Sequence, residues 1–338
     1  MNNLNMNNLN MNRRSLLTGA AAASAAAALT PFASSLATAA APPVGKQSSG
    51  WYRYKVGTHE VTVATDGVTR FRFPDGFVIN KSRDEVNEAW AGLFQERDQM
   101  AIPYSPIAVN TGSKLIVIDT GTGEANFEAN KGSAGQFHGN LKASGIDRNQ
   151  VDVVIISHFH GDHIFGLLTP DNKPSFPNAE IMVPATEWKY FMDDAEMAKQ
   201  TTDRMKGVFA GARRVFDNLG RKVTQYDANK EIAPGITSLA TYGHTPGHIS
   251  YVIASGNAKV FVQSDVTNNP LFVRNPGWHL MFDQDPQMAE ATRRRVYDML
   301  VADKMMVQGF HYPFPALAYI EKSGTGYREL PVPWSPSI

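Results

Sequence analysis

Cysteine is absent from this sequence of 338 residues. Disulfide bonds and thiolate metal ligands are therefore excluded, and any metal site must be built from His, Asp and Glu. An excess of charge of either sign is also absent, because 32 Lys and Arg residues balance 32 Asp and Glu residues. A neutral chain has no overall field to attract nucleic acid or an anionic membrane surface. We therefore expect no nucleic-acid partner.

Long apolar runs are scarce as well. An Ala-rich stretch that ends near Ala28 is too short and too weakly apolar to span a bilayer. No later segment is long and apolar enough to cross a membrane. We expect no membrane anchor. Apolar residues nevertheless make up 43% of the chain, which is enough for a folded protein with a large core.

The N-terminus has the features of an export signal. Residues 1–12 repeat a polar, Asn-rich unit that cannot pack a core. Arg13-Arg14 then precede the Ala-rich stretch, and Ala37-Thr38-Ala39 offers a cleavage site of small residues. This order predicts a twin-arginine signal within residues 1–40, and a periplasmic or secreted protein. The alternative is a cytoplasmic protein with a disordered Ala-rich tail. The start of translation is left open among three methionines: Met1, Met6 and Met11.

From residue 50 onward, apolar runs alternate with turn residues. We predict strands at 51–56, 60–65, 107–110, 115–119, 153–156, 181–184, 236–241, 251–254 and 260–263. We predict helices at 85–94, 185–199, 202–218 and 286–302, and one that ends at 140–144. The rest of 70–104 reads as irregular. Strands in two batches with helices between them indicate a layered α/β (α+β) sandwich, formed as one domain by residues 50–338.

The strongest local signal is His158-x-His160-x-Asp162-His163, which directly follows the β-branched run Val153-Val154-Ile155-Ile156. Residues i and i+2 of an extended segment can both point at one ion, and a turn at Gly161 brings the last two side chains towards a second position. Such a cluster is costly to bury unless an ion ligates it. We predict that this motif binds metal.

Three further ligand types follow later apolar runs. His244 comes after the strand that ends at Thr241, Asp265 follows the run 260–263, and His311 follows the run 306–310. Loops at strand ends are common positions for functional side chains. These residues are therefore candidates to complete the site.

The full set resembles the dinuclear hydrolase branch of the metallo-β-lactamase superfamily. The resemblance implies an αββα sandwich with the metals between the edges of two sheets. It implies one metal on His158, His160 and His244, and a second on Asp162, His163 and His311. Asp265 would bridge the two, and the two aspartates would position a catalytic hydroxide.

A closer similarity is to methyl parathion hydrolase and its relatives, which act on organophosphates and lactone-type esters. It rests on five stretches spread over the chain: 50–53, 109–115, 119–121, 140–142 and 326–328. The sequence departs from that enzyme at 122–137 and 266–285, which could both flank the substrate pocket. The resemblance therefore predicts the fold and the metal site better than the substrate.

Several residues near the motifs have open roles. His248 could be mistaken for the ligand, but the family pattern favours His244 and leaves His248 a supporting role. Asp119 is either a turn residue or a carboxylate that orients a ligand histidine. His59 and His138 read as packing or surface residues. His279 is the remaining histidine most expected to touch substrate.

The proposed reaction is attack of a metal-bridging hydroxide on a carbonyl or phosphoryl centre. Two divalent ions about 3.5–4 Å apart can hold that hydroxide and lower the pKa of water to about 7. Zinc is the default metal, although manganese, iron or cobalt would suit these ligands.

The predicted substrate is a small, neutral, largely apolar ester, lactone or organophosphate triester, and a homodimer is left open. Aromatic candidates for the pocket are Phe127, Trp188, Phe191, Phe209, Phe272, Trp278 and Phe282.

Alternative functions share the motif. A single-iron persulfide dioxygenase begins with a similar HxHxDH and would hold one iron in place of two divalent ions. A β-lactamase or a nuclease of the same superfamily is also conceivable, though a nuclease would need a basic surface. A non-catalytic binding protein would not need seven ligands.

Overall fold

The computed structural model describes Gly45 and residues 47–338. The predicted export signal at 1–40 lies outside these residues and stays a prediction. Within the described residues, no helix has the length and apolar character needed to cross a membrane.

Two seven-stranded sheets dominate the fold. The first sheet has the order β1-β2-β5-β6-β7-β8-β9: Trp51–Val56, His59–Ala64, Ile107–Asn110, Leu115–Ile118, Val153–Ile155, Glu180–Pro184 and Thr224–Tyr226. The second follows chain order, β10 to β16: Glu231–Ala233, Ile236–Ala240, Ile249–Ser255, Ala258–Ser264, Met306–Gly309, Leu317–Ser323 and Gly326–Pro331. The predicted strands are present, with shifts of one or two residues at their ends.

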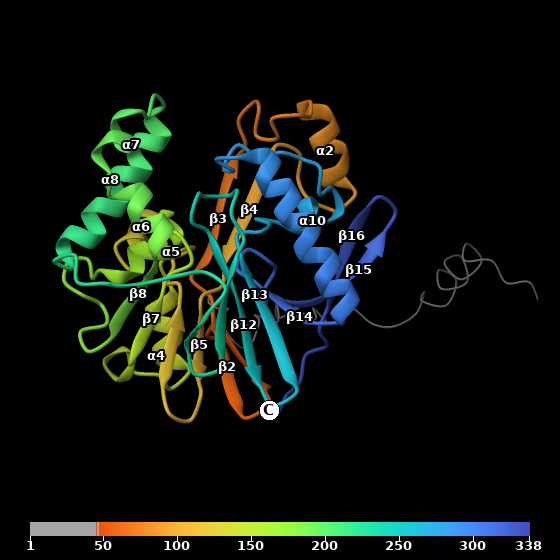
Figure 1. Cartoon of the computed structure of the whole chain (residues 1–338). Helices are drawn as coiled ribbons and strands as arrows, with labels where there is room; N and C mark the ends of the chain where they lie inside the picture. The colour runs from red at the N-terminus through yellow and green to blue at the C-terminus, as the bar shows by residue number, and fades with distance from the viewer. Residues whose placement is uncertain (1–44, 46) are drawn as a thin grey trace, which may run out of the picture. The chain divides into compact units, whose positions relative to one another are not determined.

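Helices surround the two sheets (Figure 1). They are α2 Arg83–Ala91, α3 Asn126–Ala129, α4 Phe137–Ala143, α5 Gly161–Ile164, α6 Ala185–Phe191, α7 Asp194–Ala198, α8 Asp203–Asn218, α9 Pro270–Arg274 and α10 Pro286–Asp303. Short 3₁₀ turns lie at Arg148–Gln150 and Phe165–Leu167. The predicted helix at 185–199 is two helices, because Asp193 accepts hydrogen bonds from the amides of Ala195 and Glu196 and begins a new one.

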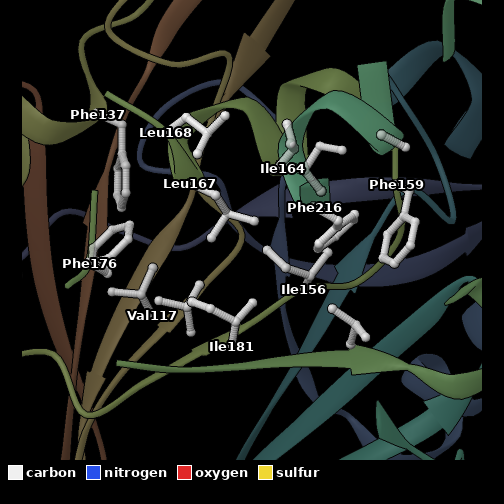
Figure 2. Packing of buried hydrophobic residues seen from close by; sticks show 14 of the residues in the cluster. Val117, Phe137, Ile156, Phe159, Ile164, Leu167, Leu168, Phe176, Ile181 and Phe216 are labelled. Atoms are coloured by element: carbon white, nitrogen blue, oxygen red, sulfur yellow. The ribbon is translucent and has the colours of Figure 1, made fainter. Parts of the chain in front are cut away.

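Three apolar clusters hold these layers together. Side chains of the first sheet pack against α4, α5 and α8, as Figure 2 shows for Val117, Ile181 and Phe216. A second cluster joins the facing surfaces of the two sheets, and a third packs α10 on the second sheet. Since burial of apolar area is the main stabilising term in folding, the order helix–sheet–sheet–helix follows from these faces. This is the predicted αββα sandwich.

A separate two-stranded ribbon lies outside the main sheets. It pairs β3 (Gly67–Arg72) with β4 (Gln99–Tyr104) and packs with α2 and α9 around its own apolar cluster. The prediction that 70–104 is irregular apart from one helix was wrong for the segments that form this ribbon. Its strands pair across α2, so neither carries a local hairpin signal.

The parallel strands place several loops at one edge of the sandwich. In the first sheet β6, β7 and β8 are parallel, and in the second sheet β13 and β14 are parallel. Carboxyl ends of parallel neighbours lie together, which is where α/β folds commonly expose functional side chains. The loops that follow β7, β13 and β14 carry six of the seven candidate ligands.

Candidate metal centre

The first four candidate ligands lie in the loop that follows β7. Ser157 begins this loop, and both its amide and its hydroxyl donate to the carboxylate of Asp119 at 2.8 Å. Asp119 itself ends β6 with a left-handed φ of 57°. A Cβ on Gly161 would lie 2.5 Å from the ring of Phe165, so any larger residue at that position would displace this ring. The loop is therefore fixed before it reaches its last ligand, His163.

The other three ligands come from the second sheet. His244 follows β11, Asp265 follows β13, and His311 follows β14. The turn before His244 brings the backbone close to α10: Gly243 has a φ of +126°, and a Cβ there would lie 2.3 Å from the amide of Ala289. This close approach requires glycine.

All seven predicted ligands meet in one place. Their donor atoms form two groups, and within each group all donor atoms lie within 4.8 Å of one another. The first group is His158, His160, His244 and Asp265, and the second is Asp162, His163 and His311. In the first group, His160 Nδ1 lies 3.1 Å from His158 Nε2 and 2.9 Å from His244 Nε2.

Asp265 lies between the groups. Its Oδ2 is 3.2 Å from His244 Nε2 and 3.2 Å from His311 Nε2, and its Oδ1 is 3.1 Å from His163 Nε2. Asp162 contacts only the second group, with Oδ2 3.5 Å from His311 Nε2. Asp265 therefore occupies the position that a bridging ligand requires.

Three of the histidines have their outer nitrogen engaged by an acceptor. The pairs are His163 Nδ1 with Asp119 at 2.8 Å, His244 Nδ1 with Asp283 at 2.9 Å, and His311 Nδ1 with the Pro103 carbonyl at 2.8 Å. A proton on each Nδ1 leaves the Nε2 lone pair facing the cluster, which is the tautomer that a metal needs. Asp119 thus contacts a candidate ligand as well as ending a turn. Asp283 was not foreseen, because it lies in a loop without a recognisable motif.

Burial and charge act against each other at this cluster. Burial holds the pKa of His158 well below its usual value. Burial also lowers the pKa of His244, but the hydrogen bonds that it donates to the carboxylates of Asp265 and Asp283 outweigh burial and raise that pKa to about 9. Burial raises the pKa of Asp265, while the charges of His311 and His163 hold it well below the usual range. The cluster therefore favours positive charge at its centre.

These residues fit two divalent cations. His163 Nε2 and Asp265 Oδ1 are buried and have no hydrogen-bond partner among the described residues. Buried polar atoms are nearly always paired, so two unpaired atoms that face one another indicate a missing ligand. Imidazole nitrogen and carboxylate oxygen are the donors that zinc and similar ions accept.

A supporting layer holds Asp265 in place. His248 Nε2 accepts a hydrogen bond from the Asp265 amide at 2.9 Å, and Asn268 donates to Asp265 Oδ2 at 2.7 Å. Burial lowers the pKa of His248 to about 3, so the ring stays neutral and can accept. His248 belongs to neither donor group, whereas His244 does.

Glu187 connects the two ligand loops and was also missed. Its side chain is completely buried and accepts from the amide of Phe159, the amide of Gly247 and the hydroxyl of Thr245. One carboxylate at the start of α6 thus fixes the loop of His158 and His160 relative to the loop of His244. The sequence shows only a Glu in a helix.

The donor groups lie at the floor of a cavity of about 380 Å³, which we call the main cavity because several of the donors line it. Its walls are largely apolar: Phe71, Ile102, Tyr104, Phe165, Val208 and Phe282. Polar groups on the walls include Asn268 and Arg204, which is half-buried and donates to the Met281 carbonyl. Of the seven predicted aromatic residues, only Phe282 lines this cavity.

The other six aromatic candidates do not line this cavity. Phe191, Phe209 and Phe272 are fully buried in the core, and the rings of Trp188 and Trp278 pack against core clusters. Phe127 is exposed and does not line the main cavity. Phe71 and Phe165 take their place, but neither position carries a sequence pattern that separates it from core phenylalanines.

The remaining histidines lie away from the floor. His279 was expected to touch substrate but is not among the residues that line the main cavity; its Nε2 lies 2.9 Å from Glu290. His138 is buried, with Nε2 2.9 Å from the Gly166 carbonyl, and His59 is buried in β2. Both match their predicted packing role.

Residues 103–302 match the metallo-beta-lactamase superfamily. The chain belongs to the metallo-beta-lactamase superfamily. The match covers more than half of the chain and includes six of the seven ligands; His311 lies beyond it.

Known relatives in this superfamily include lactonases. The chain is 25% identical over 170 residues to N-acyl homoserine lactonase AiiA of Bacillus thuringiensis subsp. kurstaki, which covers 49% of this chain and 58% of the lactonase. It is 30% identical over 119 residues to N-acyl homoserine lactonase AttM of Agrobacterium fabrum (strain C58 / ATCC 33970), covering 35% and 42%. The chain thus spans about half the length of the curated relatives that it matches.

Solved structures extend the similarity to the whole fold. The structure of AidC, a dizinc quorum-quenching lactonase in complex with a product, superposes with a TM-score of 0.78 and 24% identity, covering 85% of this chain and 99% of AidC. AbOPH, a hydrolase in the beta lactamase superfamily, gives a TM-score of 0.77 and 24% identity over 86% and 100%. At this identity the likeness establishes the fold, and the prediction of the metallo-β-lactamase fold is confirmed. The closer similarity to methyl parathion hydrolase stays a prediction.

Proposed function

We propose that this protein is a metal-dependent hydrolase of neutral lactones and carboxylic esters. The observation that carries the proposal is the meeting of seven His and Asp donors in one place, five of which line the floor of a largely apolar cavity. The lactonase activity of the named relatives supports the choice of substrate class. Zinc is the proposed metal, because all the donors are imidazole or carboxylate.

Two bound divalent ions would supply a nucleophile at neutral pH and would polarise the oxygen of the scissile carbonyl. The chain contributes the geometry. Asp265 is held by His248 and Asn268, so its two oxygens stay directed at the two donor groups. Rigid ligands of this kind keep the reacting centre in a productive arrangement.

Side chains around the floor can handle protons and oxygen charge. Asp162 is partly exposed and lines the main cavity, so its carboxylate can accept the proton of the attacking water and return it to the leaving alkoxide. Tyr104 lines the same cavity, and burial raises the pKa of its phenol. The phenol therefore stays protonated and can donate to the oxygen that becomes negative.

The walls favour a neutral substrate with an apolar part. Phe165, Val208 and Phe282 offer apolar contact, and among the described residues Arg204 is the one lysine or arginine in the lining. A dianionic phosphate monoester would find no cluster of basic groups there. Two donor groups also favour a two-metal hydrolase over the single-iron dioxygenase that shares the HxHxDH start.

The test is a substrate panel on zinc-loaded protein whose metal content is measured by elemental analysis. We expect about two zinc ions per chain and the highest kcat/KM on an N-acyl lactone or an aryl ester. A phosphotriester and a β-lactam complete the panel. The proposal fails if protein with two bound zinc ions hydrolyses neither lactones nor esters, or if it holds only one ion in excess zinc.

A further inference from the structure

The ribbon of β3 and β4 separates two cavities. Successive residues of a strand point to opposite faces. On one face of β4, Ile102 and Tyr104 line the main cavity. On the opposite face, Ala101 and Pro103 line a second cavity of about 460 Å³, which we name the rear cavity.

The rear cavity opens to solvent and is lined by parts of the chain that are distant in sequence. The end of α2 and the turn after it contribute Trp90 and Leu93, α9 contributes Arg274, and β16 contributes Glu329. Arg70 lines it from β3. Apolar and charged groups thus meet in one space, which is typical of sites that bind small amphipathic molecules.

Two buried polar atoms in these walls have no partner among the described residues. They are Trp90 Nε1, a donor, and Glu329 Oε2, an acceptor. The other oxygen of Glu329, Oε1, lies 3.2 Å from Arg274 Nη2. Buried polar atoms without a partner are uncommon in folded proteins. A bound hydrogen-bond acceptor would satisfy Trp90 Nε1, whereas Glu329 Oε2 would need a donor.

The charges in the rear cavity do not cancel. Arg274 is paired with Glu329, whereas Arg70 forms no ion pair within residues 47–338. Arg70 is exposed, so its positive charge is in contact with solvent as well as with a wall that carries an indole and a leucine. A guanidinium beside apolar surface is suited to a carboxylate that is attached to an apolar body.

We propose that the rear cavity is a second binding site, for a small amphipathic carboxylate with an aryl or alkyl body. The carboxylate pairs with Arg70, and the body packs against Trp90 and Leu93. This site goes beyond the proposed hydrolase reaction, because its occupant lies across the ribbon from the metal donors. The only candidate ligand that borders both cavities is His311, whose Nδ1 lies 2.8 Å from the Pro103 carbonyl.

The experiment is calorimetric titration of the zinc-loaded full chain with 4-phenylbutyrate as the probe. A carboxylate can also ligate zinc, so each titration is repeated in excess acetohydroxamate, which occupies the metal centre. We expect one saturable site that persists in acetohydroxamate. The uncharged analogue 4-phenylbutanamide should bind about tenfold more weakly, as expected when a charge-assisted contact is lost.

Variants assign the site to the rear cavity. Arg70→Gln should weaken 4-phenylbutyrate binding about tenfold. Arg72→Gln is the matched control, because Arg72 is exposed on the same strand, pairs with Asp98 and does not line the cavity; its affinity should equal that of the wild type. Trp90→Phe keeps the shape and removes only the unpaired N–H, so it should reduce affinity for a ligand that accepts this hydrogen bond.

Three results would overturn the proposal. The first is loss of all binding in acetohydroxamate, which would place the probe at the metal centre only. The second is equal affinity of the wild type and Arg70→Gln for 4-phenylbutyrate. The third is equal affinity of the acid and the amide for the wild type. None of these depends on whether lactones or esters are hydrolysed.

Discussion

The floor of the main cavity consists of polar side chains at strand ends, whereas its walls consist of apolar side chains from the ribbon, from α8 and from loops. Several floor residues are held by further hydrogen bonds, as His163 is by Asp119 and His244 by Asp283. Wall residues such as Phe165 and Phe282 are positioned by packing, with the guanidinium of Arg214 over the first ring and that of Arg204 over the second. Chemistry should therefore be sensitive to single atoms at the floor, and substrate preference should change gradually with the walls.

The largest expected effect separates two neighbouring histidines of the floor. His244→Ala removes a donor, so zinc content should fall and hydrolysis should decrease by at least about 1,000-fold, because several kcal/mol of stabilisation by the metal are lost. His248→Ala should lower activity about 10–100-fold, since His248 only holds the Asp265 amide. Elemental analysis and initial rates measure both effects. The reverse ranking would make His248 the ligand.

A substitution at Asp119 tests whether zinc binding depends on the side chains that orient the ligands as well as on the ligands themselves. Asp119→Asn replaces one acceptor oxygen with a donor beside His163 Nδ1, so zinc affinity should fall about 10–100-fold. Competition with a chelator measures the affinity. Asp152→Asn is the control, because Asp152 precedes the same strand β7 at its opposite end and accepts from the Leu115 amide. Unchanged zinc affinity in Asp119→Asn would reduce Asp119 to a turn residue.

The walls should respond differently. Phe282→Ala should leave two zinc ions bound and change the preference between long-chain and short-chain lactones about tenfold, because apolar contact with the chain is lost. The ratio of kcat/KM for the two substrates is the measurement. Phe94→Ala, at a fully exposed ring, should change nothing. Loss of zinc from Phe282→Ala would show that the walls and the floor are not separable.

The floor of the main cavity could be predicted from the sequence, whereas its walls could not. Histidines and aspartates that directly follow a buried strand, as His158 follows β7, can be recognised in the sequence because an apolar run changes abruptly to polar residues there. Phe165 and Phe209 look alike in the sequence, yet one lines the main cavity and the other lies in the core. Their difference depends on how α8 and the ribbon pack, which involves contacts between distant segments. The carboxylates of Glu187 and Asp283 were missed for the same reason.

The fold shows this limit too. The strand at 153–155 was predictable from its β-branched run, and α10 from its helical pattern. Ribbon strands β3 and β4 were not, since each is mixed in polarity and finds its partner across α2. The break between α6 and α7 depends on one side chain, that of Asp193, which a continuous helical pattern conceals.

The smallest expected effect is one on stability: Glu187 should make the free energy of unfolding depend on pH. Burial raises its pKa from 4.5 to about 7, despite the hydrogen bonds that it accepts. The folded protein therefore binds more protons than the unfolded chain between these values, and stability should fall as pH rises from about 4.5 to about 7. The total is on the order of 3 kcal/mol at most.

Urea unfolding of the zinc-loaded protein at pH 5 and pH 7.5 measures this slope. Glu187→Gln should be less stable at both values, because an amide cannot accept all the hydrogen bonds, but should lose the dependence attributed to the carboxyl group. Glu196→Gln, on the exposed helix α7, should keep the wild-type slope. A slope unchanged in Glu187→Gln would assign the titration to other groups.

The ribbon between the two cavities also bears on how such a protein can change over generations. Successive residues of β4 face different cavities. Substitutions at 102 and 104 can therefore alter the main cavity, while residues 101 and 103 keep the rear cavity unchanged. A slip of one residue in the pairing of β3 with β4 would exchange the two sets, placing Pro103 towards the metal donors and Tyr104 away from them. Adaptation by substitution can therefore be gradual and confined to one compartment, whereas insertion or deletion in this segment would alter both at once.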